Sequence, residues 1–82
     1  MSNRIIELLN SESYKDRMKG EYLFVKDKYN KLHSMIIKHE AGVLDFTLSC
    51  QLDLLKDQAV AMGKYLYTLE VRAMIENVDL NE

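Results

Sequence analysis

The chain has 82 residues, with 13 acidic and 11 basic side chains, a formal charge of −2, and 48% apolar residues. This length allows one small domain, residues 1–82, and the apolar share excludes a disordered tail. The slightly acidic balance excludes a general binder of DNA, RNA or anionic membranes, which would carry a large positive excess. Cys50 is a single cysteine and cannot form an internal disulfide. No stretch is apolar enough for a signal peptide or a membrane span, so we expect a cytoplasmic protein.

Two helices are predicted in the N-terminal half. Clustered Ile and Leu residues predict a short helix over about residues 3–10. A long helix is predicted over about residues 14–40, where Ser13 can form the N-cap and Asp16 can stabilise the first turn. Apolar residues of this long helix recur at steps of four and three: Met18, Tyr22, Val25, Tyr29, Leu32 and Ile36. This spacing places them on one side of a helix.

A second long helix is predicted over about residues 48–77. Its apolar residues follow the same spacing without a break: Leu48, Leu52, Leu55, Ala59, Met62, Leu66, Leu69 and Ala73. Gly42 suits a left-handed stop for the preceding helix, and Thr47 or Ser49 could cap this one. Gly63 lies inside it, where the missing side chain either allows close approach by a neighbouring helix or is a tolerated accident.

The predicted fold class is all-α, a short N-terminal helix followed by a long antiparallel helical hairpin. A short connection makes the two long helices antiparallel neighbours. Many apolar residues, among them Leu54, Tyr67 and Met74, lie off the apolar stripe of their helix. A hairpin has one internal face, so this surplus predicts a homo-oligomer. The alternative is a three-helix monomer with scattered exposed apolar residues.

Charge and tyrosines are unevenly distributed. Residues 15–38 carry seven basic and three acidic side chains, whereas residues 39–82 carry three basic and eight acidic ones. The first interpretation is that a basic helix pairs with an acidic one; the second is an anion site where basic helices of different subunits meet. Tyr14, Tyr22 and Tyr29 lie on the basic helix. Tyrosines beside lysines can stack on nucleobases, although at this spacing they are more often core or interface residues.

Enzymatic and metal-binding patterns are absent from the sequence. There is no glycine-rich phosphate loop, and Cys50 is not accompanied by a recognisable histidine partner, because His33 and His39 fall on the other long helix. The histidines and carboxylates do not have metal-ligand spacing. We therefore expect no catalytic residues, no metal site and no cofactor.

Two stretches carry a family resemblance. RMKGEYLFVKDKYNKLHSMI begins at Arg17 and includes the Glu21-Tyr22 pair; LLKDQAVAMGKYLYTLEVR ends at Arg72 and has a distinctive pattern of Leu-Leu, Gln, Ala-Met, Tyr, Leu and Arg. Over about 55 of the 82 residues the chain resembles the phage anti-CBASS cyclic-oligonucleotide sponges. That resemblance implies a compact helical homohexamer in the cytoplasm of the infected bacterial host. It would bind cyclic dinucleotides such as cyclic GMP–AMP, and also cyclic trinucleotides, without cleaving them, so that CBASS effectors are not activated.

The resemblance also implies pockets between subunits. Tyr22 matches the family's base-stacking tyrosine, and Lys38 is the nearest match for its phosphate-contacting lysine. Arg72 fits the closing motif, where it would serve a cyclic-trinucleotide site or an interface salt bridge. The longer connection HEAGVLDFTLSC departs from the family pattern and would reshape a pocket rim.

Two other functions remain open from the sequence. One is a protein–protein interaction module that binds a host or phage protein through its apolar face. The other is a sponge for a cyclic ADP-ribose type of signal, which would keep the fold and change the ligand.

Overall fold

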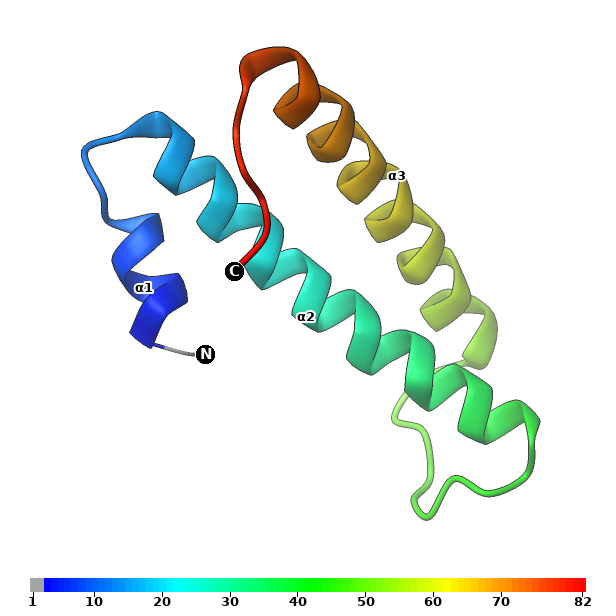
Figure 1. The fold of residues 1–82 in the computed structure, drawn as a ribbon. Helices are drawn as coiled ribbons and strands as arrows, with labels where there is room; N and C mark the ends of the chain where they lie inside the picture. The colour runs from blue at the N-terminus through cyan, green and yellow to red at the C-terminus, as the bar shows by residue number, and fades with distance from the viewer. Residues whose placement is uncertain (1–2) are drawn as a thin grey trace.

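The computed structural model describes residues 3–82, and within them the chain is all-helical, with three helices and no strand (Figure 1). The helices are α1 (Asn3–Leu9), α2 (Tyr14–Glu40) and α3 (Leu52–Glu76). The bounds of α1 and α2 agree closely with the apolar spacing of the sequence. The start of α3 does not.

The ends of α2 form as the sequence predicts. The Ser13 side chain accepts a hydrogen bond of 3.4 Å from the backbone N–H of Asp16, which caps the first turn. After Glu40 the chain leaves the helix through Gly42, whose φ of 77° is a left-handed conformation that glycine adopts without steric cost. The predicted cap and stop signals of α2 are both confirmed.

The start of α3 was predicted too early. The helix begins at Leu52 rather than near residue 48, and its N-cap is Gln51, which makes no side-chain cap hydrogen bond. Neither Thr47 nor Ser49 is therefore the cap. Leu48 remains in the connecting loop and lines a hollow there together with Leu52. Apolar spacing alone cannot separate such a loop residue from the first turn of a helix.

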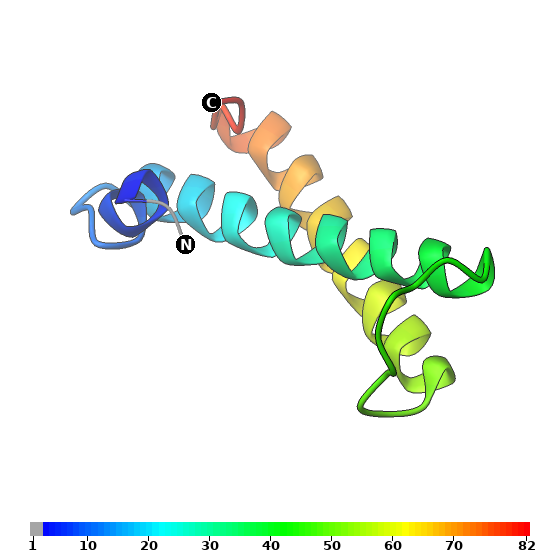
Figure 2. The ribbon, with the colours of Figure 1, turned by 90° about the horizontal axis from the view of Figure 1, so that it is seen from below.

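Helix α2 is the central element, packed against both other helices, whereas α1 and α3 have no close backbone contact with one another. In Figure 1, α2 and α3 run in opposite directions from their connecting loop, and Figure 2 shows that they cross obliquely. Helices that cross in this way contact each other over only part of their length. The molecule is accordingly elongated, with extents of 43 × 26 × 18 Å.

The buried core is small and lies mostly at one end. Leu66, Leu69 and Ala73 are the buried residues of the α3 stripe, whereas Leu55 and Met62 of the same stripe are only partly buried. Met18 of α2 packs with Leu69 and Ala73 to form the central cluster. A single chain therefore leaves much of its apolar surface in water, as the sequence indicated.

The segment after α3 completes this end of the molecule. Asn77 adopts a left-handed conformation, and the Val78 N–H donates to the Ala73 carbonyl at 2.9 Å, so the chain turns back on the helix. Val78 and Leu80 then pack against the central cluster. Glu82 forms ion pairs with Arg4 of α1 at 2.5 Å and Lys19 of α2 at 2.9 Å. Figure 1 shows this red segment passing from the end of α3 down to α2.

Acidification should release this segment. Hydrogen bonds from Lys19 and Arg4 hold the pKa of Glu82 below its ordinary value of 4.5. A carboxyl whose pKa is lowered on folding stabilises the folded state above its unfolded pKa, and this contribution is lost as the pH falls through the folded value. We expect the methyl NMR signals of Val78 and Leu80 to shift toward exposed positions below about pH 4.5. Glu82→Gln should show that shift already at pH 7; signals of this variant identical to those of the wild-type protein at pH 7 would contradict the expectation.

The closest approach between two helices lies at Gly20, where α1 meets α2. A Cβ placed on Gly20 would lie 2.9 Å from Leu8 Cβ and 3.0 Å from the Leu9 backbone nitrogen. Backbone atoms cannot yield as a flexible side chain can, so α1 would have to move. Gly20→Ala should lower the free energy of unfolding by about 1–3 kcal/mol in urea denaturation.

Gly63 provides the matched control. Of the two interpretations left open by the sequence, the structure favours a tolerated glycine over one required for a tight helix contact. A Cβ at Gly63 would meet only Tyr29 Cε1, at an ordinary distance of 3.7 Å. Gly63→Ala should therefore stabilise α3 by up to about 1 kcal/mol, because alanine is the better helix former. Equal effects of the two substitutions would show that helix packing does not distinguish these glycines.

Candidate functional site

Tyr22 is held by both long helices. Its hydroxyl donates a hydrogen bond of 2.6 Å to Glu70 Oε2 on α3, and the residue packs against Met18, Leu69 and Ala73. Burial, with the hydrogen bond to Glu70, raises the pKa of Tyr22 to about 12. The phenol is therefore neutral and remains a donor to the carboxylate at physiological pH.

A hollow of about 380 Å³ opens beside Tyr22. Helix α3 contributes Glu70 and Met74 to its lining, and the segment after α3 contributes Val78 and Leu80. Apolar walls around an aromatic ring, with a few polar groups, are typical of sites for small organic ligands. This hollow therefore gives Tyr22, the tyrosine predicted from the sequence, surroundings in which a small organic ligand could bind.

Lys38 lies near the other end of α2 and is exposed. It lines a separate hollow of about 470 Å³ together with Met35 of α2 and Leu44, Asp45 and Phe46 of the connecting loop. A lysine at the rim of a hollow can bind an anion without a large desolvation cost.

Arg72 forms an ion pair of 2.9 Å with Glu76, one turn later on α3. The hydrogen bond to Glu76 raises the pKa of Arg72 and, in return, the one from Arg72 lowers the pKa of Glu76. The arginine is absent from the residues that line the hollow beside Tyr22. Within one chain its charge is matched by its own helix.

One chain does not bring the three predicted site residues together. Tyr22 and Lys38 are sixteen positions apart on α2, which corresponds to about 24 Å along the axis and a rotation of about 160°. They therefore point to nearly opposite sides of α2 and lie more than four turns apart. A single site that uses both needs two copies of the chain.

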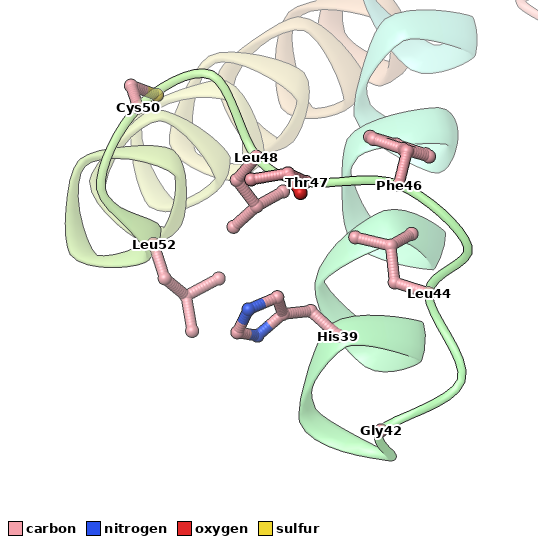
Figure 3. A pocket seen from close by; sticks show the side chains of 8 residues that line it. All are labelled: His39, Gly42, Leu44, Phe46, Thr47, Leu48, Cys50 and Leu52. Atoms are coloured by element: carbon pink, nitrogen blue, oxygen red, sulfur yellow. The ribbon is translucent and has the colours of Figure 1, made fainter.

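Another hollow, of about 540 Å³, lies where the connecting loop meets the ends of α2 and α3. Figure 3 shows the His39 ring pointing into it toward Leu52, while Cys50 lies on the loop away from the ring. An ion pair between Lys56 and Glu40 joins the two helices at this end. These positions do not form a histidine-activated thiol.

Tyr29 is engaged by its own helix. Its ring stacks on His33 with a centroid distance of 5.7 Å and an interplanar angle of 6°, and Lys26 Nζ lies 5.8 Å from the ring centre. Two of the three tyrosines on the basic helix reach α3: Tyr22 donates a hydrogen bond to Glu70, and a hydrogen bond from Tyr14 helps to lower the pKa of Glu76.

Sequence reasoning missed Glu70 and the segment that follows α3. The Tyr22–Glu70 pair spans 48 positions, so no local pattern could have revealed it. Val78 and Leu80, alternating with polar residues after Asn77, carried a weak signal of a half-buried segment.

Residues 3–82 contain neither a cluster of metal ligands nor a helix of the kind that crosses a membrane. No group of three or more His, Cys, Asp or Glu side chains in this part of the chain could hold a metal ion. None of the helices described here is both long and apolar enough to span a bilayer.

A comparison with known protein families places most of the chain in one of them. The family model for Sequestin matches residues 12–75, most of the chain. The chain belongs to the Sequestin family. The Sequestin match covers α2 and nearly all of α3 and includes Tyr22, Lys38, Glu70 and Arg72, whereas α1 and the segment after α3 lie outside it. No curated protein and no solved structure matches the chain.

Proposed function

We propose that this Sequestin-family chain binds cyclic oligonucleotide second messengers at pockets between subunits and sequesters them without cleavage. In an infected bacterial host this would prevent CBASS effectors from being activated. The observation that carries the proposal is the family match over residues 12–75, whose family name denotes sequestration and whose matched region holds the tyrosine and basic residues of the sponge-like motifs.

The proposal that the chain assembles rests on its exposed apolar surface. A second stripe runs along α3 at steps of four and three: Val60, Lys64, Tyr67, Val71 and Met74. Its apolar members remain 59%, 68%, 41% and 83% exposed. The stripe is rotated by roughly 140° from the face that packs on α2, so α3 can contact its own α2 and a second copy at once.

Assembly would also complete the ligand site. Because Tyr22 and Lys38 point in opposite directions on α2, the proposed pocket takes the tyrosine from one copy and the lysine from another. A cyclic dinucleotide has two bases and two phosphates with approximate two-fold symmetry, and a pocket on a subunit dyad offers each side chain twice. Stacking and charge-assisted contacts would then supply binding energy without any catalytic group.

The decisive experiment is isothermal titration of the purified protein with cyclic GMP–AMP, cyclic di-GMP and a cyclic trinucleotide. We expect submicromolar binding to at least one of them and recovery of the intact nucleotide after the protein is denatured. Absence of binding to all three would remove the proposal. Recovery of a linear nucleotide would show an enzyme instead of a sponge.

Two further arms of the experiment separate the alternative functions. Binding of a cyclic ADP-ribose isomer, with none of the cyclic oligonucleotides, would keep sequestration and change the ligand class. A stoichiometric complex with one host or phage protein, formed by a chain that is monomeric when free, would favour an interaction module.

A further inference from the structure

We propose that Glu70 is a positioning residue of the Tyr22 site: it holds the tyrosine by its hydroxyl, so that the ring face and not the hydroxyl meets a nucleobase. This inference rests on the proposed function and assigns a role to a residue that carries none in the sequence motifs. It concerns the contact between α2 and α3 beside the hollow of about 380 Å³.

Tyr22 is restrained by contacts at its hydroxyl and along its ring. The Tyr22 hydroxyl reaches across to Glu70 Oε2 at 2.6 Å, a distance typical of a strong hydrogen bond to a charged acceptor. The tyrosine is at the same time packed against the cluster of Met18, Leu69 and Ala73. Contact along the ring and at its tip leaves the side chain little freedom to rotate.

The hydrogen bond to Glu70 occupies the hydroxyl of Tyr22 but leaves the ring face open to a ligand. A hydroxyl whose single proton is donated to Glu70 has no proton left for another acceptor. The aromatic surface that borders the hollow, next to Met74 and Leu80, stays available. A planar base can use that surface, and stacking on a ring that is already oriented loses less conformational entropy.

The charges that line this hollow determine which part of a nucleotide can enter it. Glu70 and Asp79 both line this hollow, and two carboxylates repel the phosphates of a cyclic nucleotide. A ligand would therefore enter this end base first and leave its phosphates toward basic side chains elsewhere in the assembly. In one chain the Lys38 hollow lies at the opposite end of α2, which agrees with a separate phosphate subsite.

The test is a double-mutant cycle of Glu70→Ala and Tyr22→Phe, measured by titration with cyclic GMP–AMP. Each single substitution removes the hydrogen bond and should weaken binding about tenfold. The double variant should be no weaker than either single variant, since both remove the same contact. Glu70→Gln keeps an acceptor and should retain more affinity than Glu70→Ala.

The hydrogen bond between Tyr22 and Glu70 can also be tested without a ligand, through the ionisation of the tyrosine. In an alkaline absorbance titration, the wild-type protein should show a late tyrosine ionisation near pH 12, and Tyr22→Phe should remove this late step. Glu70→Ala should move the step to lower pH, whereas Asp57→Ala, which removes an exposed carboxylate elsewhere on α3, should leave both the step and the affinity unchanged.

The outcomes separate this inference from the proposed function. If the wild-type protein binds the nucleotide and Glu70→Ala binds equally well, or if the cycle is additive, the positioning role is wrong and sequestration stands. If the wild-type protein binds none of the cyclic oligonucleotides, the proposed function fails and the role of Glu70 at that site fails with it.

Discussion

Tyr22→Ala should weaken binding of cyclic GMP–AMP by roughly 100-fold. Loss of one base–aromatic stack costs about 1–3 kcal/mol, and a pocket on a two-fold axis loses two stacks at once. Because every 1.4 kcal/mol is about a factor of ten in affinity, two losses near the low end of that range already reach this effect. Isothermal titration of the variant against the wild-type protein measures it.

The Tyr22→Ala experiment needs a fold-preserving companion, because Tyr22 also packs on the core cluster. Tyr22→Phe retains the ring and should lose only the smaller, hydroxyl-dependent part of the affinity. Tyr65→Ala is the matched control, since Tyr65 is an exposed tyrosine of α3 that does not line the Tyr22 hollow. Unchanged affinity of Tyr22→Ala would place the ligand elsewhere, even if the protein is a sponge.

Tyr67→Glu should dissociate the proposed assembly and abolish nucleotide binding at the same time. Tyr67 is 68% exposed in a single chain, so a charged side chain there does not disturb the fold of that chain. In an interface the carboxylate would be buried without a partner, which costs several kcal/mol. Because the stripe is repeated on every copy, a symmetric assembly suffers this cost many times.

Light scattering and circular dichroism measure this second prediction. The wild-type mass should be a multiple of the 9.6 kDa chain, and Tyr67→Glu should shift it to the single-chain value while the helical signal is retained. Thr68→Glu adds the same charge to the next exposed position, about 100° around α3, and should stay assembled. A wild-type protein that is monomeric at micromolar concentration would contradict both the stripe interface and the shared pocket.

The two predictions separate the two parts of the proposed site. Tyr22→Ala removes a contact to the ligand and leaves the stripe on α3 intact, so its mass should remain that of the wild-type protein. Tyr67→Glu leaves Tyr22 and Glu70 in place and removes the partner copy. Loss of binding in both variants, with loss of mass in only one, is the pattern expected of a pocket shared between subunits.

The helices were the part of the fold most fully predictable from sequence. An apolar residue at every third or fourth position specifies a helix face locally. Ser13 supplied the start signal of α2 through its side chain, and Gly42 supplied the stop signal through its backbone conformation. The start of α3 was missed because Leu48 continues the apolar spacing while it lines a loop hollow. Apolar spacing indicates that a residue is buried, but it does not show whether the residue belongs to a helix or to a loop.

The candidate site was predictable only in its parts. The sequence identified Tyr22, Lys38 and Arg72 as candidates, and the family match includes all three. The pairing of Arg72 with Glu76 and the distance of Lys38 from Tyr22 along α2 follow from helix geometry within one helix. The hydrogen bond between Tyr22 and Glu70 and the hollow beside it depended on the positions of the side chains in space.

The amino-acid sequence by itself determined that this protein is helical, that its long helices carry more apolar surface than one chain can cover, and that it belongs to the Sequestin family. Only the tertiary structure decided that α1 packs on Gly20, that the segment after α3 returns to the core, and that Glu70 holds Tyr22. The physical reason is the number of positions that separate the interacting residues in the sequence. Helix periodicity arises between residues three or four positions apart, whereas these contacts join residues far apart in the chain, and the geometry of the packed helices selects them.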